Sequence, residues 1–457
     1  MTRPAMIAAA LADWATGPLD PPAAVRRAAL RHLLDGLGTA LAGRRGGTVD
    51  PALHVARDLG GPPEATLLGG RDTIGAPAAA LAAGAMVHAL DFDDTHAAGL
   101  VHATAVVLPA AFAVGEQVGA SGRDVLHAAI AGYETVCRVA AAAPHGFHAR
   151  GLHATMVAGV FSSALVTARL LRLDTARATD ALGIAGSQAG GLLAFLHTGA
   201  ATKQLHPGFA SHAGILAARL AAAGAAGPAN VFDGPHGVFD ALAAGPVDPA
   251  SIIAGLGQRW ETLRIGIKPY PACQLSHAAI DAARAARRQP GFPADPAAIA
   301  RIDVDVHPDS APTVCGPGRD LTRPATPYAA KFSLPWSVAA TLLDGDLTTA
   351  SYRPDAIDRA DVTALAARLH WRIVATGGHA ADAPGSVVVT LADGTTVRGV
   401  VPRSGGGPDT PLTDDELAAK FLGNAGPAGA PVVDLLRRLD DLDDLDPIMA
   451  ALAAAGD

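Results

Sequence analysis

The chain has 457 residues and a formal net charge of −8 at pH 7. Half of its residues are hydrophobic and 17% are charged, a balance that excludes intrinsic disorder, and the length suggests about two to four domains. No basic stripe is visible, which excludes the usual electrostatic footprint of a nucleic-acid-binding protein. The three cysteines, Cys137, Cys273 and Cys315, lie far apart and form no CxxC pair, so we expect a cytoplasmic protein without a disulfide framework.

Residues 5–225 are predicted to be mostly helical, because Ala, Leu and Arg favour helices. Asp20 followed by two prolines is typical of a helix start, and Gly43 is the expected end of that helix. The stretch 174–183 is expected to form a short helix that Gly183 closes. Several long helices joined by short links that contain glycine predict a helical bundle.

Three segments carry no Asp, Glu, Lys or Arg: residues 73–90, 151–168 and 181–202. Their length alone would admit membrane-spanning helices. Each contains a His, however, and 181–202 adds Ser, Gln and several glycines. We therefore expect buried helices of a soluble protein with no membrane partner. Three such helices are too many for the core of one subunit, which predicts a homodimer with an apolar interface beyond ~2,000 Å².

The pattern changes near residue 262, where alternation of apolar and polar residues begins. The expected strands are 301–308, 369–376 and the two arms of a hairpin in 386–401, and the expected helices between them are 276–288 and 331–343. After residue 411 the chain returns to a helical pattern. The sequence therefore predicts a mainly α protein with a large, discontinuous, all-α helical domain (1–262 and 405–457) and a smaller α+β lid domain (263–404).

Only four of the 35 basic residues are lysines: Lys203, Lys268, Lys331 and Lys420. A lysine in an arginine-rich chain suggests a position where arginine cannot serve, because the ammonium is a compact point charge. Lys420 lies in a polar C-terminal helix and is interpreted as a surface residue. Lys203 and Lys268 are flanked by apolar residues, Gly or Pro, and are predicted to belong to a functional site.

The segment 88–105 places three acids, followed by His96 and His102, between apolar stretches. His102 is the natural general acid/base in it, since a histidine pKa lies near neutrality, and a nearby Asp can orient the ring. Asp91 and Asp93 with the same histidines could instead hold a metal ion. The metal alternative has weaker support, because the chain has no HExxH motif.

Two further clusters precede helices. His153 and Lys203 each stand just before an apolar helix, where backbone N–H groups favour anions. Lys268, Cys273 and His277 fall near the expected domain junction, and clefts between domains commonly hold small molecules. Cationic groups around a few acids suit a substrate with more than one carboxylate.

At these residues the chain resembles the MmgE/PrpD family. The matching pieces are Asp35-Gly36-Leu37-Gly38, HALDFDDTH (88–96), GLHATMV (151–157), ATKQLHPG (201–208), IKPYPACQLSH (267–277) and AAKFSLPW (329–336). The resemblance implies a helical domain with an α+β lid, usually a homodimer, and no metal or organic cofactor. The family includes 2-methylcitrate dehydratase, cis-aconitate decarboxylase and iminodisuccinate epimerase.

Carried over residue by residue, the resemblance makes Asp91, His102, Lys203 and Lys268 the catalytic residues. It places Thr95 and His153 at the substrate, and we add Cys273 and His277 from the junction cluster. Cys273 stands where the decarboxylase has a His, and the decarboxylase Tyr after the first lid strand has no clear counterpart here. Both departures argue against cis-aconitate decarboxylase activity.

The leading hypothesis is a cofactor-independent lyase or isomerase that moves a proton at a carbon next to a carboxylate of a di- or tricarboxylate. A 2-methylcitrate dehydratase-like hydro-lyase is placed first. An iminodisuccinate epimerase-like isomerase or a cis-aconitate decarboxylase-like enzyme is the alternative within the family. A metal-dependent hydrolase and a catalytically inactive helical scaffold are the alternatives from other classes.

Overall fold

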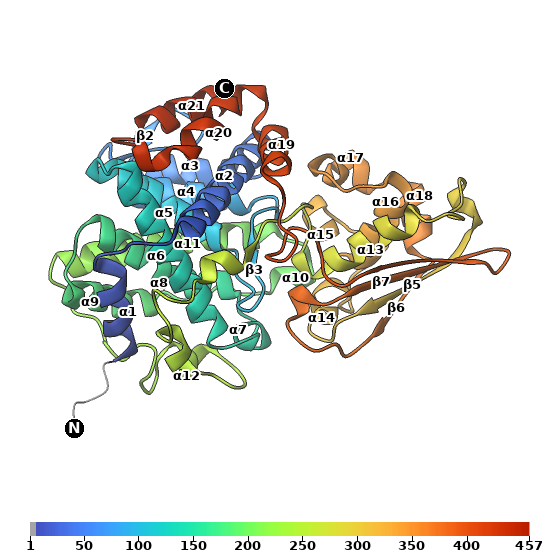
Figure 1. Ribbon diagram of the computed structural model, residues 1–457, viewed down its shortest axis with the longest axis horizontal. Helices are drawn as coiled ribbons and strands as arrows, with labels where there is room; N and C mark the ends of the chain where they lie inside the picture. The colour runs from blue at the N-terminus through green and yellow to red at the C-terminus, as the bar shows by residue number, and fades with distance from the viewer. Residues whose placement is uncertain (1–5, 457) are drawn as a thin grey trace.

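The computed structural model describes residues 6–456 and has two lobes, one helical and one with a four-stranded sheet (Figure 1). The helices are α1 Ile7–Thr16, α2 Ala23–Arg45, α3 Asp50–Leu59, α4 Ala76–His88, α5 Ala103–Val118, α6 Gly122–Ala141, α7 Gly146–Ala149, α8 Ala154–Leu170, α9 Thr175–Gly186, α10 Phe195–Thr198, α11 His206–Ala222, α12 Val238–Leu242, α13 His277–Arg287, α14 Ala311–Val314, α15 Pro327–Ala330, α16 Leu334–Asp344, α17 Pro354–Ile357, α18 Ala360–Ala366, α19 Asp414–Ala425, α20 Ala430–Arg437 and α21 Asp446–Gly456. The strands are β1 Ala65–Thr66, β2 Thr73–Ile74, β3 Thr95–His96, β4 Ile265–Gly266, β5 Ile299–Val306, β6 Leu369–Ile373, β7 Gly385–Leu391 and β8 Thr396–Val401. The prediction of a mainly α fold with a smaller α+β part is confirmed.

Small side chains let the central helices of the helical lobe pack closely. Every residue of α4 is buried; α5, α6 and α11 pack on α8, and α4 packs on α5 and α11. Gly84 of α4 meets Gly208 of α11 so closely that a Cβ on Gly84 would lie 2.5 Å from the Gly208 nitrogen. The alanine and glycine content of these helices therefore sets their spacing, as ridge-and-groove packing requires. The lobe is not strictly all-α, because the short pairs β1–β2 and β3–β4 belong to it.

The second lobe is built on a sheet of order β6-β5-β7-β8. β5 and β6 run parallel, and the other neighbours are antiparallel. Helix α13 packs on β7 and β8, and α16 packs on α13. The predicted hairpin is present: Gly394 has a φ of 87° in the turn, and the Asp393 carboxylate accepts a hydrogen bond from the Thr395 nitrogen.

Three predicted helix ends are wrong, and the two that involve a glycine share a reason. Asp20 does not cap α2, which begins at Ala23 after Pro22 and runs past Gly43 to Arg45. A Cβ on Gly43 would lie 2.5 Å from the Met86 oxygen, so this glycine permits helix contact and does not end the helix. Gly183 likewise lies inside α9, packed against the backbone at Pro228.

The argument for a homodimer also loses its premise. Helices α4 and α8 are buried within one subunit, and residues 181–202 form no single helix. The homodimer therefore stays a prediction. Among residues 6–456, no helix combines the length and the apolar character that crossing a membrane requires.

The chain crosses between the lobes twice. Strand β4, just before the sheet lobe, pairs with β3 of the helical lobe, with Thr95 opposite Gly266. At the other end α19, α20 and α21 return to pack on α2, so the C-terminus lies on the helical lobe (Figure 1). The boundaries at 262 and 405 stay predictions. Because the chain runs in this way, segments that are far apart in the sequence meet where the two lobes join.

Candidate active site

A cavity lies between the lobes, with about 560 Å³ of empty space when the part that is open to solvent is counted. Its polar lining residues are Asp91, Thr95, His102, His145, His148, His153, Lys203, Cys273, Gln274 and Thr313, and its apolar ones are Leu100, Leu193, Phe195, Leu196, Leu275 and Phe332. Six of the eight site residues named from the sequence therefore line one cavity. Lys268 lies just behind it, fully buried, and His277 lies outside it.

Asp91 is the centre of the polar wall. Its Oδ1 lies 2.7 Å from Nζ of Lys203 and 3.2 Å from Nζ of Lys268. The Lys268 ammonium also donates to the backbone oxygen of Asp91 at 2.9 Å. Asp91 has a φ of 50°, in the left-handed region that side chains rarely adopt, and such strain persists only where contacts hold it. The two lysines provide those contacts.

The charge state of Asp91 follows from its neighbours. Burial alone would raise the pKa of this carboxyl group, but the ammonium groups of Lys203 and Lys268 outweigh burial and hold the pKa well below its ordinary value. Asp91 is therefore an anion that fixes two ammonium groups at the edge of the cavity.

His102 stands beside this charge cluster at the N-terminus of α5. Its Nδ1 lies 3.0 Å from the Asp94 backbone oxygen, and its Nε2 lies 3.3 Å from Nζ of Lys203. A carbonyl can only accept, so Nδ1 carries the hydrogen and Nε2 presents a lone pair that accepts from Lys203. Burial, together with Lys203 and Lys268, lowers the pKa of His102 well below its ordinary value. The ring is therefore neutral near pH 7.

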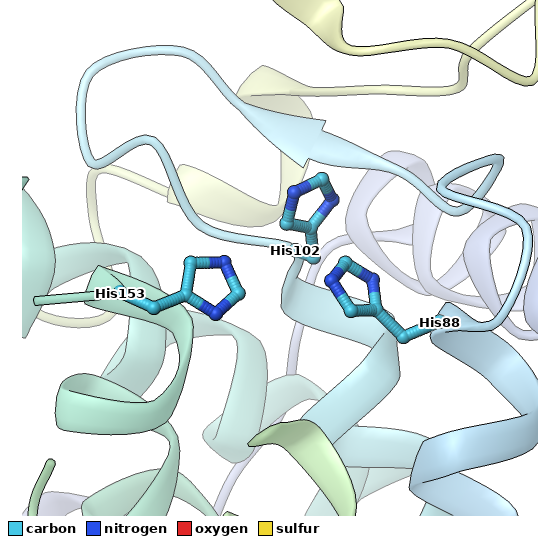
Figure 2. A group of neighbouring side chains, drawn as sticks. All are labelled: His88, His102 and His153. Carbon is cyan, nitrogen blue, oxygen red and sulfur yellow. The ribbon is translucent and has the colours of Figure 1, made fainter. Parts of the chain in front are cut away.

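Three imidazoles converge from three elements at this place: His88 ends α4, His102 precedes α5 and His153 precedes α8 (Figure 2). The rings of His88 and His102 have centroids 4.4 Å apart. His88 Nδ1 lies 2.9 Å from the Asp93 carboxylate, which orients it. Sequence reasoning had not selected His88, although it begins the HALDFDDTH segment.

His153 forms a second polar contact with a residue from another helix. Its Nδ1 lies 3.1 Å from Nδ1 of His206, at the start of α11. Burial and nearby Lys203 lower the pKa of His153 well below its ordinary value, and burial lowers the pKa of His206 to about 4. Both rings are thus neutral near pH 7, with one donating a hydrogen bond to the other.

Of the other residues predicted to contact the substrate, Thr95 and Cys273 line the cavity and His277 does not. Thr95 Oγ1 lies 3.5 Å from Nδ1 of His102, at the cavity edge. Cys273 lines the cavity, and burial raises the pKa of its thiol to about 11, so it is neutral there. His277 points away: its Nε2 lies 3.0 Å from the Ala272 backbone oxygen, and burial lowers its pKa to about 3. His277 fits a structural role at the start of α13 better than substrate contact.

The interpretation of Lys420 as a surface residue is wrong. Its side chain is only 7% exposed, and its Nζ lies 2.5 Å from Oδ1 of Asp35 on α2. It also donates to the backbone oxygen of Phe92 at 2.9 Å and lies 3.9 Å from the centroid of the Phe92 ring. The polar residues of α19 that suggested a surface position lie on its outer face, whereas the Lys420 ammonium points inward. Lys331, which the sequence left without a role, is buried as well and donates to the Pro271 oxygen.

The same cluster resembles a metal site by distance alone. Among residues 6–456, His88, Asp91, Asp93 and His102 offer ligand atoms within 4.8 Å of one another, and so do His88, His102 and His153. However, two ammonium groups already contact Asp91, and one contacts His102 Nε2. Such positive charge repels a divalent cation and favours an anionic ligand. The donor set therefore fits a bound carboxylate better than a metal ion.

Comparison with known proteins agrees with this arrangement. The MmgE/PrpD N-terminal domain model matches residues 9–249, and the MmgE/PrpD C-terminal domain model matches residues 270–436. The cis-aconitate decarboxylase-like protein oryM of Aspergillus oryzae is 31% identical over 91% of this chain and 89% of its own length. The cis-aconitate decarboxylase of Aspergillus terreus is 28% identical over 98% of this chain and 96% of its own.

A mammalian relative matches a shorter part of the chain. The cis-aconitate decarboxylase of Mus musculus is 31% identical over 75% of this chain and 70% of its own length. The matched domains follow each other in the same order as the two lobes. The chain therefore belongs to the MmgE/PrpD family and is an enzyme of its lyase and isomerase group.

Proposed function

We propose that this protein is a cofactor-independent lyase that decarboxylates a small unsaturated polycarboxylate of the cis-aconitate type. The relatives support decarboxylation over the 2-methylcitrate dehydratase-like reaction that the sequence analysis placed first. The observation that carries the proposal is the arrangement of Asp91, Lys203 and His102 at one wall of the cavity between the lobes. It supplies fixed positive charge and a neutral proton-transfer group at the same point.

The chemistry needs both features. In a decarboxylation of this type, the bond between an allylic carbon and its carboxylate breaks, and CO₂ leaves. The electron pair moves across the C=C bond to the carbon next to a second carboxylate, which then takes a proton. Negative charge grows on the second carboxylate before the proton arrives. The Lys203 ammonium, held by Asp91, is positioned to stabilise that charge, and this kind of electrostatic stabilisation is commonly the largest catalytic effect.

Proton delivery is assigned to the pair of His102 and Lys203. The lone pair on His102 Nε2 faces the ammonium at 3.3 Å, so a proton can pass between them without a large movement. Thr95 and the Asp94 carbonyl oxygen hold the imidazole from its other side. Asp91 stays ionised throughout and keeps both lysines in place.

The test is turnover of purified protein treated with a chelator, with cis-aconitate, 2-methylcitrate and iminodisuccinate offered separately in D₂O. We expect CO₂ release from the cis-aconitate-type substrate and one deuterium, seen by NMR, at the former alkene CH carbon that bears the second carboxylate. Water loss from 2-methylcitrate without decarboxylation, or epimerisation of iminodisuccinate, would replace the proposal with the other family reaction. Activity that the chelator abolishes and zinc restores would revive the metal-dependent alternative.

A homodimer and a cytoplasmic location are proposed together with this function. Light scattering at micromolar concentration tests the first, and cell fractionation tests the second.

A further inference from the structure

We propose that the natural substrate carries an apolar arm in addition to the two carboxylates that the reaction requires. This inference rests on the proposed decarboxylation and names the substrate class more narrowly. The arm would lie against the side of the cavity that Phe195, Phe332 and the neighbouring leucines form.

That side of the cavity is a continuous apolar wall. Phe195 and Phe332 have ring centroids 5.8 Å apart, and both side chains are almost fully buried. Leu193, Leu196 and Leu275 also line the cavity. Removing such an apolar wall from contact with water lowers the free energy, so a ligand group that covers it with apolar surface binds favourably. Ligand sites of this kind place a few polar groups at one end and hold the apolar body of the ligand at the other.

The aromatic pair stands directly beside the reacting end. The Nζ of Lys203 lies 5.4 Å from the centroid of the Phe332 ring, while the same atom contacts Asp91 on its other side. A carboxylate bound at Lys203 would therefore have the Phe332 ring as its neighbour. An arm extending from that end of the substrate would run along Phe332 and Phe195.

The cavity has little charge left for a third carboxylate. Among the described residues that line it, Lys203 is the one lysine or arginine. Its ammonium and that of Lys268 share the single Asp91 carboxylate, so one positive charge is left for a substrate that already brings two carboxylates. Burial lowers the pKa values of His102, His148 and His153, so these rings add no positive charge near pH 7. An unpaired buried carboxylate costs several kcal/mol. A third carboxylate is thus poorly matched to this cavity.

The reaction itself does not need a third carboxylate. One carboxylate leaves as CO₂ and a second accepts the electron pair, so any further group serves binding alone. Leu193 and Leu196 also line an outer pocket that adjoins the cavity and contains Arg319. An arm that passes these leucines therefore has room to extend, and its length can exceed a methyl group.

The experiment compares kcat/KM for cis-aconitate with two probe series. In the first, an alkyl group replaces the central carboxylate (3-alkylglutaconates); in the second, the alkyl group is added to cis-aconitate at its CH₂ carbon. We expect at least one series to exceed cis-aconitate by tenfold or more, with a gain of about fourfold per methylene, which corresponds to the usual ~0.8 kcal/mol per buried CH₂. If cis-aconitate equals or exceeds every arm-bearing probe, the proposal is overturned.

A binding measurement separates this inference from the proposed reaction. Calorimetry with unreactive saturated acids compares 3-propylglutarate with propane-1,2,3-tricarboxylate. Tighter binding of 3-propylglutarate supports the apolar arm even if no probe is decarboxylated, in which case only the proposed reaction fails. Tighter binding of the tricarboxylate rejects the arm.

A pair of variants tests the location of the arm. Leu196→Lys places a cation in the apolar wall and should lower the preference for the best arm-bearing probe over cis-aconitate by at least tenfold. Leu192→Lys is the matched control, because Leu192 is 66% exposed and does not line the cavity, and it should stay within twofold of the parent. Thermal melts establish that both variants fold. Folded Leu196→Lys with an unchanged preference would place the arm elsewhere and reject the wall.

Discussion

Replacing Lys420 by Met tests how strongly the C-terminal helix α19 is tied to the active-site turn. The change keeps the length of the stem and removes only the ammonium, which lies 2.5 Å from Asp35 Oδ1 and 2.9 Å from the Phe92 oxygen. Breaking a buried ion pair by removing one partner costs about 3–5 kcal/mol. That is a large part of the ~5–15 kcal/mol by which proteins are usually stable. We expect Lys420→Met to lose about 3 kcal/mol or more near pH 8.

The loss should depend on pH in a defined direction. Burial raises the pKa of Asp35 to about 6, although Lys420 lowers it, so removing the lysine raises that pKa further. A raised pKa in the folded state means that the protonated carboxyl group is favoured and that stability falls as pH rises. Lys420→Met should therefore be much less destabilised near pH 5 than near pH 8, as measured by urea unfolding.

The double variant Lys420→Met/Asp35→Asn provides the control, because it removes both charges and should recover most of the lost stability. Its activity gives a second measurement. Phe92 follows Asp91 directly, so losing the contact to its carbonyl should lower kcat of the proposed reaction even in the stable double variant. A Lys420→Met protein within about 1 kcal/mol of the parent near pH 8, or equally destabilised at both pH values, would refute this reasoning. Lys420→Arg is expected to be harmful, contrary to the expectation for a surface lysine.

Three further predictions concern the other buried groups. His102→Gln should fold normally and lower kcat by ~10²–10⁴-fold; near-normal turnover would remove His102 from the mechanism. Lys203→Arg and Lys268→Arg should each damage activity strongly, since guanidinium cannot reproduce two ammonium contacts at one Asp91 oxygen; activity within twofold of the parent for both would reject the site. Burial lowers the pKa of Lys331 to about 7 from 10.5, so its contribution to stability is complete above pH 10.5 and lost as the pH falls towards 7. Urea unfolding of the parent should show stability rising in that window by up to ~1.4 kcal/mol per pH unit, and Lys331→Met should abolish the rise.

The parts of this fold that depend on local pattern could be predicted from the sequence. The strand alternation of 301–308 and the hairpin at 386–401 are set by side chains that alternate between two faces. Helix ends were less predictable where a glycine was involved. Gly43 and Gly183 look like helix ends in the sequence, but contacts with distant backbone decide their role, and those contacts are tertiary.

In the candidate site too, some features could be predicted from the local sequence and others depend on the three-dimensional structure. His102, Asp91, Lys203 and Lys268 could be selected because charged or titratable groups stand out in apolar sequence. The orientation of a side chain could not be deduced in the same way. His277 lies in the same motif as Lys268, yet its ring points to the Ala272 backbone oxygen, because the backbone just before α13 offers a hydrogen-bond acceptor there.

The four lysines of the chain share a feature that explains why they are not arginines. Each side chain is buried, and each terminal nitrogen donates to a backbone carbonyl or a carboxylate in a confined place: Lys203 to Asp91, Lys268 to Asp91, Lys331 to Pro271 and Lys420 to Phe92. An ammonium has three donors that can turn towards such acceptors, whereas a guanidinium has five in a rigid plane and would leave several unsatisfied. Lys268, at the junction with the lid, donates to the backbone carbonyl of Asp91, and Lys420, on α19, donates to the next carbonyl, that of Phe92. The strained turn that presents Asp91 is therefore held by two lysines from distant parts of the chain, Lys268 at the junction of the lobes and Lys420 on α19, which ties the C-terminal helix α19 to the candidate site.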